Sequence, residues 1–333
     1  MSIFEMPLLS KLQFILFKEI FMKSLHSVLI VSLFLCVFVF SCKQKPDEAG
    51  KNNPVNVVSE KLEFSIEGVK FIMKRIPSAQ GVMLGDESID DNKPYKVSLD
   101  SFMIGETEVT QELWQTIMSD NPSRFKDEPS EGEIQEKRPV ENVRWYDCIF
   151  FCNELTKRLN NGDDGECVYY SDEKLSVLYT KDDAVALNDP YQNMNKKGFR
   201  LPTEAEWAYA AMGGKTKKFA GTDEKELLKE YAWFSNEDGG DANEKTHEVK
   251  KKKPNGYYLY DMCGNVREWC WNRWTENSPS GGNNPTGGQT GGLRITQGGA
   301  YFFDAFYSSI IYRAGDDPDG ISDVNGLRLV CRP

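Results

Sequence analysis

Short periodic segments joined by long polar connections most restrict what this chain can fold into. Apolar residues recur at strand or helix spacing only over short stretches. We find no internal repeat with a period of roughly 20 to 50 residues, so a solenoid or a propeller is excluded. Residues 278–292 contain six glycines and two prolines, which predicts a surface loop without regular structure. The chain is therefore expected to adopt an irregular α+β fold, low in regular secondary structure.

A strand and a short helix are predicted in the first part of the fold. Residues 97–104 alternate apolar and polar side chains, which predicts one strand that ends at Gly105. Thr110 then precedes apolar residues at helical spacing between Leu113 and Met118. This pattern predicts a short amphipathic helix with Thr110 as its N-cap.

Two more helices are predicted from spacing and capping. Apolar residues recur every three or four positions over 145–159, which is typical of a helix with one buried stripe. Thr203 followed by Glu206 is a capping-box pattern, in which each side chain accepts a hydrogen bond from the other residue's backbone N–H. Gly213 is the residue type that commonly ends a helix, so a third helix is expected between them.

Residues 22–42 have the three parts of a bacterial export signal. Lys23 supplies the positive charge, residues 28–40 form an apolar run of 13, and Ser41 precedes Cys42. About 20 apolar residues are needed to cross a bilayer, so this run is too short for an anchor. We expect a signal peptide over 1–41, with Met22 as an alternative start. The remaining alternatives are a plain cleaved signal without lipid and an unusual membrane helix.

The end of this signal resembles a lipobox, the motif whose cysteine is lipidated. On that resemblance Cys42 carries the lipid and attaches the chain to the outer membrane, at the cell surface or, alternatively, on the periplasmic face. Phe40 is larger than the usual residue there, a departure that spirochaete lipoproteins tolerate. Residues 42–60 are polar and predict a flexible tether, so the folded domain is expected over 61–333.

Charge and histidine content exclude several functions. The formal net charge of −11 argues against nucleic-acid binding, because phosphate recognition needs a basic face. The one basic run, at 250–253, is followed by Pro254, and we predict a solvated turn there. The chain has only His26 and His247, and His26 falls in the signal. A site with several histidine ligands is therefore excluded, and a Ser-His-Asp hydrolase would depend on His247.

Six cysteines follow Cys42, and they do not form a recognisable metal motif. No two of them are spaced as CxxC, so neither a zinc knuckle nor a thioredoxin-like site is supported. In an exported protein they can form disulfides, but six cysteines allow 15 pairings. We favour simple burial for the two that share one face of a predicted helix. The six are Cys148, Cys152, Cys167, Cys263, Cys270 and Cys331.

Four segments in a fixed order carry a family pattern. They are Pro-Val-Glu-Asn-Val-Arg-Trp-Tyr-Asp at 139–147, Gly-Phe-Arg-Leu-Pro-Thr-Glu-Ala-Glu-Trp at 198–207, Asn-Gly-Tyr-Tyr-Leu-Tyr-Asp-Met-Cys-Gly-Asn-Val-Arg-Glu-Trp at 255–269, and Gly-Gly-Ala-Tyr at 298–301 with Gly-Leu-Arg at 326–328. Together they resemble the formylglycine-generating-enzyme (sulfatase-modifying-factor) superfamily over roughly residues 64–333. The resemblance implies a C-type-lectin-like fold of the formylglycine-generating-enzyme type.

The residues that would perform the family's oxidation are replaced. Formylglycine-generating enzymes bind copper through two cysteines placed after the Gly-Gly-Ser motif, and the aligned positions here are Phe303 and Ser308. The superfamily's iron-binding sulfoxide synthases need histidine ligands that this chain lacks. We therefore expect no enzyme activity. The alternative is an oxidase or protein-modifying enzyme with an altered centre that uses Cys263 or Cys331. The resemblance also puts Cys152 and Cys331 near a cysteine pair that is bonded in some relatives.

The resemblance also implies a calcium site. Relatives hold one ion at a Gly-Asn-Val-Trp-Glu-Trp loop through an Asn or Asp side chain, two backbone carbonyls and a glutamate. The matching positions are Asp261, Gly264, Val266 and Glu268, and such oxygen donors suit a hard cation. The alternative is that both acids accept hydrogen bonds from backbone amides in a tight turn. We expect no required cofactor, with a structural calcium ion as an open alternative.

The last 36 residues have an unusual composition. Residues 298–333 contain no Lys, Glu, Gln, Met or Trp, although these five types fill more than a quarter of the residues before them. No codon that ends in a pyrimidine encodes any of the five. Codons that began as AAC or AAT and were then replaced at their adenines would encode the other fifteen types and never these. The composition therefore indicates targeted codon replacement.

Such replacement is the behaviour of the retroelement-diversified variable proteins of this superfamily, which the chain closely resembles. The resemblance implies a variable region over about 298–332 within a fixed frame of Arg294, Gly298, Gly299, Arg313, Pro318 and 326–332. The positions that look substituted, and that we expect to bind ligand, are Phe302, Phe303, Asp304, Phe306, Tyr307, Ile310, Tyr312, Asp316, Asp317, Asp319, Ile321, Ser322, Asp323 and Val324.

An aromatic cluster flanked by aspartates predicts a binding surface, because interface energy concentrates on such residues. We expect a monomeric, non-enzymatic surface lipoprotein with an unknown ligand, protein rather than carbohydrate, since the Glu-Pro-Asn and Gln-Pro-Asp triplets that bind sugars through calcium are absent. The alternatives are that Phe302, Phe303 and Phe306 belong to the core, or that the chain is a structural envelope lipoprotein without a ligand.

Overall fold

A computed structural model describes residues 60–333 except 278 and 289, all within one compact unit that spans Val57–Pro333. The predicted signal peptide, Cys42 and the tether up to residue 59 lie outside the described residues. The α-helices of the described part are α2 (Gln111–Met118), α3 (Trp145–Leu159), α4 (Lys181–Val185) and α5 (Glu204–Met212). Its strands are β1 (Lys61–Ile66), β2 (Val69–Ile76), β3 (Ala79–Leu84), β4 (Tyr95–Leu99), β5 (Phe102–Gly105), β6 (Tyr169–Tyr170), β7 (Tyr191–Gln192), β8 (Arg267–Arg273), β9 (Gly282–Asn283), β10 (Arg294–Gln297), β11 (Arg313–Asp316), β12 (Asn325–Gly326) and β13 (Val330–Cys331).

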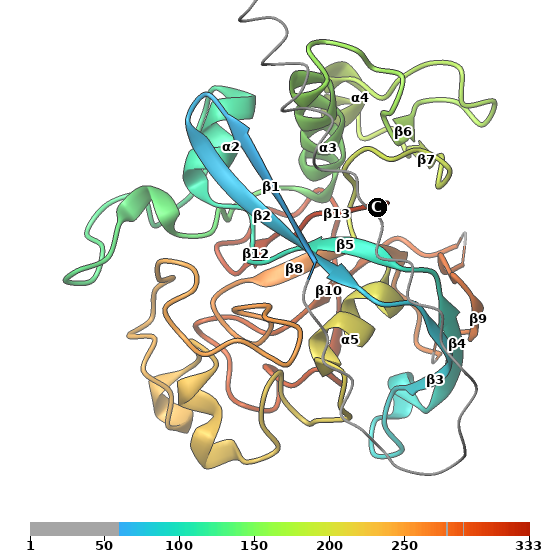
Figure 1. The fold of residues 1–333 in the computed structure, drawn as a ribbon. Helices are drawn as coiled ribbons and strands as arrows, with labels where there is room; N and C mark the ends of the chain where they lie inside the picture. Colours follow the sequence, from blue (N-terminus) through green and yellow to red (C-terminus); the bar gives the residue numbers. More distant parts are fainter. Residues whose placement is uncertain (1–59, 278, 289) are drawn as a thin grey trace, which may run out of the picture. The chain divides into compact units, whose positions relative to one another are not determined.

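One sheet, of order β11-β10-β8-β12, carries the strands on which the C-terminal residues are built. β10 runs antiparallel to both β8 and β11, and β12 pairs in parallel with β8. Helix α5 packs beside β8 and β10 (Figure 1). The C-terminal segment is therefore interleaved with β8 rather than appended to the domain.

Two other sheets complete most of the strand pairing. In the order β1-β2-β5-β13, the last strand pairs antiparallel with β5, so residues from both ends of the described chain share a sheet. A three-stranded sheet has the order β3-β4-β9. The connections between these short strands are long, which agrees with the low regular content expected.

The predicted helices are confirmed together with their caps. Thr110 accepts a hydrogen bond from Leu113 N at the start of α2. At the start of α5, Glu206 N donates to Thr203 Oγ1 at 3.2 Å and Thr203 N donates to a Glu206 carboxylate oxygen at 2.8 Å. Gly213 ends α5 with φ of 62°, a left-handed conformation that glycine adopts without steric cost.

Three details of the sequence prediction were wrong. Residues 97–104 form two strands, β4 and β5, which belong to different sheets, because the chain turns at residues 100–101. The loop at 278–292 contains the short strand β9, which pairs in parallel with β4. In the basic run at 250–253, Lys250, Lys251 and Lys253 are exposed as expected, but Lys252 is not solvated, since its Nζ lies 2.8 Å from Asp241 and 3.7 Å from the centre of the Trp233 ring.

Buried tryptophans surround β8 and fix its position in the core. Trp145, Trp207 and Trp269 are each fully buried. Each indole N–H donates a hydrogen bond, from Trp145 to Cys270 O at 2.9 Å, from Trp207 to Glu268 at 2.6 Å and from Trp269 to Val143 O at 3.0 Å. Satisfied indoles bury large apolar surfaces without an orphaned donor, so they hold β8 firmly. In the described part of the chain, no helix has the length and apolar character needed to cross a membrane.

Candidate ligand-binding site

The C-terminal segment divides into a buried frame and an exposed set of side chains. The frame residues Arg294, Gly298, Gly299, Arg313, Pro318 and 326–331 are buried, and only Arg332 at its end is exposed. Among the apolar and aromatic members of the predicted ligand-binding set, Ile321 is 69% exposed, Phe302 59%, Phe306 46% and Tyr307 39%. Asp317 and Asp319 are also exposed. Burial therefore separates the frame from most of the residues that composition and pattern predicted to bind ligand.

Buried ion pairs fasten the frame to the rest of the domain. Arg313 lies between the two exposed loops and donates to both carboxylate oxygens of Glu204, at 2.6 and 3.2 Å. Arg328 contacts both oxygens of Glu268 at 2.6 to 2.9 Å. Bidentate contacts of this kind orient the guanidinium as well as neutralising the acid. The loops are thus positioned by residues that are not themselves on the surface.

Six aromatic side chains form a continuous series of ring contacts, which we call the aromatic face. Successive ring centres lie 4.8 to 6.4 Å apart, mostly with edge-to-face geometry. Such contacts stabilise the rings against one another, so exposed rings can hold a defined arrangement. The members are Tyr301, Phe302, Phe303, Phe306, Tyr307 and Tyr312.

Arg267, at the start of β8, contacts the aromatic face through the Phe303 ring. Its guanidinium lies 4.4 Å from the centre of the Phe303 ring and 3.2 Å from Asp316, and its backbone N–H donates to Val324 O at 2.7 Å. Burial lowers the pKa of this guanidinium, and Asp316 opposes that shift. Sequence reasoning missed Arg267. The available signal was that arginine stands where the family's Gly-Asn-Val-Trp-Glu-Trp motif has tryptophan.

Several predicted aspartates pair with arginines of the same chain. Asp323 pairs with Arg124, and Asp319 contacts Arg144 at 3.1 Å. Asp316 pairs with Arg267 and accepts from Thr296 Oγ1 at 2.5 Å. These acids hold the 316–324 loop against neighbouring segments, so their charge is partly neutralised before any ligand arrives.

Two predicted ligand-binding residues are placed in the core instead. Ile310 is 6% exposed and packs in a cluster with Ile295 and Ala305. Val324 is 9% exposed and packs with Ala300 and Tyr301. Neither side chain can touch a ligand in this arrangement, so both are removed from the site. Composition identified the segment but could not predict which of its side chains are buried in the core.

An open cavity of about 440 Å³ lies beside the aromatic face. We call it the aromatic-acidic cavity, and its lining comprises Ser235, Asn236, Glu237, Asp238, Glu244, Tyr301, Phe302, Phe303, Asp304 and Tyr307. The 235–244 loop is tied to the aromatic segment because Ser235 N donates to Phe303 O at 2.9 Å and Ala305 N donates to Asp238 at 2.8 Å. Sequence reasoning missed this loop, since no periodicity or motif links it to residues 301–307.

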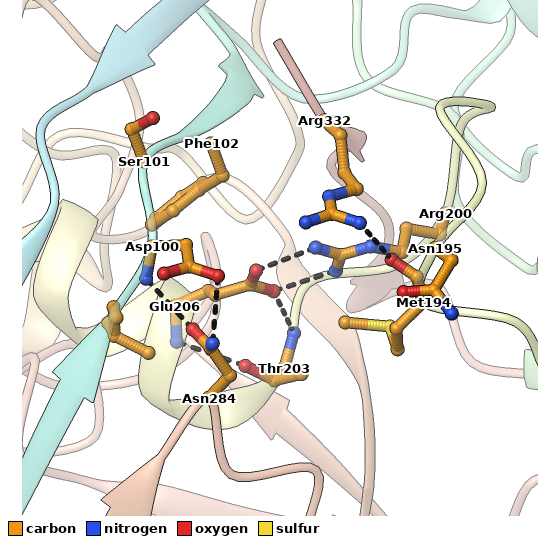
Figure 2. Close-up of a pocket in the computed structure, with 11 residues that line it drawn as sticks. Asp100, Ser101, Phe102, Met194, Asn195, Arg200, Thr203, Glu206, Asn284 and Arg332 are labelled. Atoms are coloured by element: carbon orange, nitrogen blue, oxygen red, sulfur yellow. Dashed lines mark hydrogen bonds and ion pairs between the residues drawn. The ribbon is translucent and has the colours of Figure 1, made fainter.

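A smaller cavity of about 180 Å³ contains paired charges and no predicted ligand-binding residue. Arg200 donates to both oxygens of Glu206, at 2.7 and 2.6 Å, and Arg332 donates to Met194 O at 3.1 Å (Figure 2). Figure 2 also shows Asn284 beside Asp100, which accepts from its amide at 3.0 Å. Because its charged groups satisfy one another, we do not assign a ligand to this cavity.

Of the two acids expected to hold calcium, Glu268 is fully engaged by protein groups and Asp261 only in part. Glu268 is fully buried, and both of its oxygens already accept from Arg328, with Trp207 donating as well. Asp261 accepts from Lys250 N at 2.7 Å, and burial raises the pKa of Asp261 to about 6. Across the described residues, no group of three or more His, Cys, Asp or Glu side chains is placed to hold a metal ion. Arg328 therefore neutralises Glu268, whereas one oxygen of Asp261 is buried without a hydrogen-bond partner; no metal enters our proposals.

All six cysteines of the described domain are free and buried. The expectation that Cys148 and Cys152 are simply buried is confirmed, whereas the pairing of Cys152 with Cys331 is wrong for this structure. Burial raises the pKa of Cys263 and of Cys331 to about 12. Because the thiolate is the reactive form, neither residue is prepared to act as a nucleophile or a metal ligand.

Comparisons with known proteins agree with this geometry. A family model described as the sulfatase-modifying factor enzyme 1-like domain matches residues 51–333. The chain is 34% identical over 255 residues to a protein named chaperone protein LppX from Paenibacillus barcinonensis, covering 70% of this chain and 81% of that protein. It is 35% identical over 159 residues to the formylglycine-generating enzyme of Streptomyces coelicolor, covering 43% of this chain and half (50%) of the enzyme. Among solved structures, Treponema denticola variable protein 1 is similar with a TM-score of 0.73 and 40% identity, covering 84% of this chain and 100% of that one.

Proposed function

Since the chain belongs to the sulfatase-modifying factor enzyme 1-like family and has its fold, we propose that it is a non-enzymatic member that presents a variable ligand-binding site at its C-terminal segment. In this proposal Cys42 is lipidated, and the domain is displayed as a monomer at the outer surface of the cell. Similarity to a Treponema denticola variable protein supports the variable character of this proposal.

The observation that carries the proposal is the separation by burial within residues 298–332. Exposed aromatic residues, such as Phe302 and Phe306, follow one another on a surface that buried frame residues position. Exposed side chains away from buried networks can be replaced at little cost in stability, usually within about 0.5 kcal/mol. A segment built in this way tolerates extensive replacement of its surface while its backbone stays in place.

The geometry of the family's oxidase positions argues against the enzyme alternative. Phe303 has an aromatic ring under which Arg267 lies, and Ser308 is fully buried with no partner for its hydroxyl among the described residues. Neither side chain can supply a thiolate. An altered centre at Cys263 or Cys331 would require a buried thiol with a pKa of about 12 to ionise.

Thiol labelling separates the enzyme alternative from the binding role. We expect Cys263 and Cys331 in the native protein to resist iodoacetamide at neutral pH and to react fully after denaturation, as read by mass spectrometry of each peptide. Rapid native labelling of either residue, together with oxygen consumption when thiol peptides are added, would support an altered oxidase instead.

The diversification itself is tested at the gene. We expect a reverse transcriptase gene and an adenine-rich near-copy of the last hundred or so bases close to this locus. Among isolates, replacements should fall at exposed positions such as Phe302, Phe306 and Ile321, with the buried frame unchanged. An invariant 302–324 segment among isolates would instead support a structural envelope lipoprotein without a variable site.

A protein ligand is favoured over a carbohydrate or nucleic acid. The exposed rings provide rigid apolar contacts, which dominate protein interfaces, and the cavity lining contains no lysine or arginine for phosphate.

Display on the surface is tested by adding protease to intact cells and following loss of the folded domain. Protection from protease in intact cells would indicate that the domain lies on the periplasmic face instead.

A further inference from the structure

The aromatic-acidic cavity combines exposed rings with uncompensated acids. Four carboxylates line it, those of Glu237, Asp238, Glu244 and Asp304, and no lysine or arginine is among its lining residues. Lys225 pairs with Asp238 at 2.5 Å and neutralises one of the four charges. The remaining acids give the cavity a net negative potential, which attracts cations and repels anions.

The remaining acids are presented in two ways. Asp304 is fixed, because one of its oxygens accepts from Phe306 N at 2.9 Å and from Tyr307 N at 3.1 Å. Glu237 and Glu244 are exposed, and within the described residues neither side chain has an ion pair or a hydrogen-bond partner. The cavity thus offers one carboxylate fixed by backbone hydrogen bonds and two exposed, unpaired ones to an incoming group.

The rings beside these acids are available to a cation. Phe302 and Tyr307 are 59% and 39% exposed and belong to the cavity lining. A cation placed on the face of an aromatic ring is attracted by the ring quadrupole, and the attraction grows as water is excluded. Aromatic rings and carboxylates on one cavity wall are therefore suited to a lysine or arginine side chain.

The same protein already binds a lysine in this way. Lys252 Nζ lies 3.7 Å from the centre of the Trp233 ring, and both carboxylate oxygens of Asp241 are 2.8 Å away. Trp233 precedes the 235–244 loop that forms one wall of the cavity, and Asp241 lies within that loop. An aromatic ring together with a carboxylate thus holds an ammonium group elsewhere in this domain.

We propose that the aromatic-acidic cavity binds a basic segment of a partner protein, with one lysine or arginine side chain held between the Phe302 and Tyr307 rings and the carboxylates of Glu237, Glu244 and Asp304. This inference rests on the proposed function and adds the chemical class of the ligand. The net charge of −11 favours the same partners, since long-range attraction speeds their encounter.

A random-peptide library displayed on phage, panned against the purified lipid-free chain, tests the inference. We expect enriched peptides to contain Lys or Arg beside apolar residues. Their affinity, measured by fluorescence anisotropy with synthetic peptides, should fall about tenfold in the Glu237→Gln/Glu244→Gln double variant. The matched control is Glu173→Gln, an exposed acid outside both the cavity and the C-terminal segment, which should change affinity by less than about twofold.

The outcomes separate this inference from the function on which it rests. Peptides that are neutral or acidic, yet lose binding in Phe302→Ala/Phe306→Ala, would overturn the basic-ligand inference and leave the proposed site intact. Basic peptides that lose as much affinity in Glu173→Gln as in the double glutamate variant would also overturn it, since diffuse charge would then explain binding. Enriched peptides that are all indifferent to Phe302→Ala/Phe306→Ala would overturn the proposed function itself.

Discussion

The guanidinium of Arg267 lies 4.4 Å from the centre of the Phe303 ring, so the aromatic face rests on a buried cation. The same arginine pairs with Asp316 at 3.2 Å. One side chain of β8 therefore joins the aromatic segment to the 316–324 loop. These two parts of the proposed site are distinct in sequence but share this support.

Replacing Arg267 should loosen both parts of the site. We expect Arg267→Met to lose about 2 kcal/mol or more, because Asp316 loses its cationic partner and keeps only the hydrogen bond from Thr296. Arg267→Lys should lose less, since it retains the charge but not the planar contact with Phe303. Urea unfolding measures the free energies, and near-ultraviolet circular dichroism reports the order of the rings. Equal stability of all three proteins would show that the arginine supports neither loop.

Truncation of two isoleucines in the variable segment should change the free energy of unfolding by very different amounts. Ile310 is 6% exposed, and we expect Ile310→Ala to cost about 2 to 5 kcal/mol of unfolding free energy. Ile321 is 69% exposed, and Ile321→Ala should stay within about 0.5 kcal/mol of the wild type. Urea unfolding of the two variants provides the comparison. A similar loss in both would contradict the separation of buried from exposed positions.

The buried arginine Arg313 should contribute far more to the free energy of unfolding than an exposed arginine of the same segment. Arg313→Met leaves the buried Glu204 without its partner, and we expect a loss of about 3 to 5 kcal/mol. Arg332→Met is the matched control, because Arg332 is exposed and makes a single hydrogen bond to Met194 O. Chemical denaturation of both variants is the measurement. A loss below about 1 kcal/mol in Arg313→Met would remove Arg313 from the frame.

Glu141 should make the domain less stable as the pH rises toward neutrality. Burial raises the pKa of Glu141 from 4.5 to about 7, although Arg124 N and Phe125 N donate to its oxygens. An acid whose pKa is raised by folding binds its proton more tightly in the folded state, so its contribution is full below pH 4.5 and lost as the pH passes 7. The size is at most about 3 kcal/mol.

The difference in unfolding free energy between the wild type and Glu141→Gln isolates this contribution. We expect that difference to change across the interval from about pH 4.5 to 7 and to be flat above it. Asp317→Asn, which alters an exposed acid, should follow the wild type over the same interval. A flat difference for Glu141→Gln would mean that the acid titrates normally.

Removal of divalent cations should leave the domain unchanged. Arg328 already neutralises Glu268, so we expect the same Tm in calcium and in a chelator. A calcium-dependent rise of about 3 °C or more, which corresponds to roughly 1 kcal/mol, would contradict this expectation. Loss of that rise in Asp261→Asn would then identify the loop as the metal site.

The elements that sequence predicted well depend on residues that are close together in the chain. The capping box of α5 joins Thr203 to Glu206, and the N-cap of α2 joins Thr110 to Leu113. Hydrogen bonds across three residues leave a readable pattern, and so does a buried stripe at helical spacing. The depleted C-terminal composition likewise identified the segment in which the exposed residues lie.

Tertiary structure alone decided which side chains of that segment face outward. Arg313 meets Glu204, Arg267 meets Phe303, and the 235–244 loop meets residues 301–307, although none of these partners is near in sequence. Ile310 turned inward while Ile321 stayed exposed, and the two carry the same side chain. Sequence by itself determined the family pattern, the helices and the location of the unusual segment. Burial, ion pairing and the cavity came from contacts between distant residues, because packing energy depends on which surfaces meet and not on local residue type.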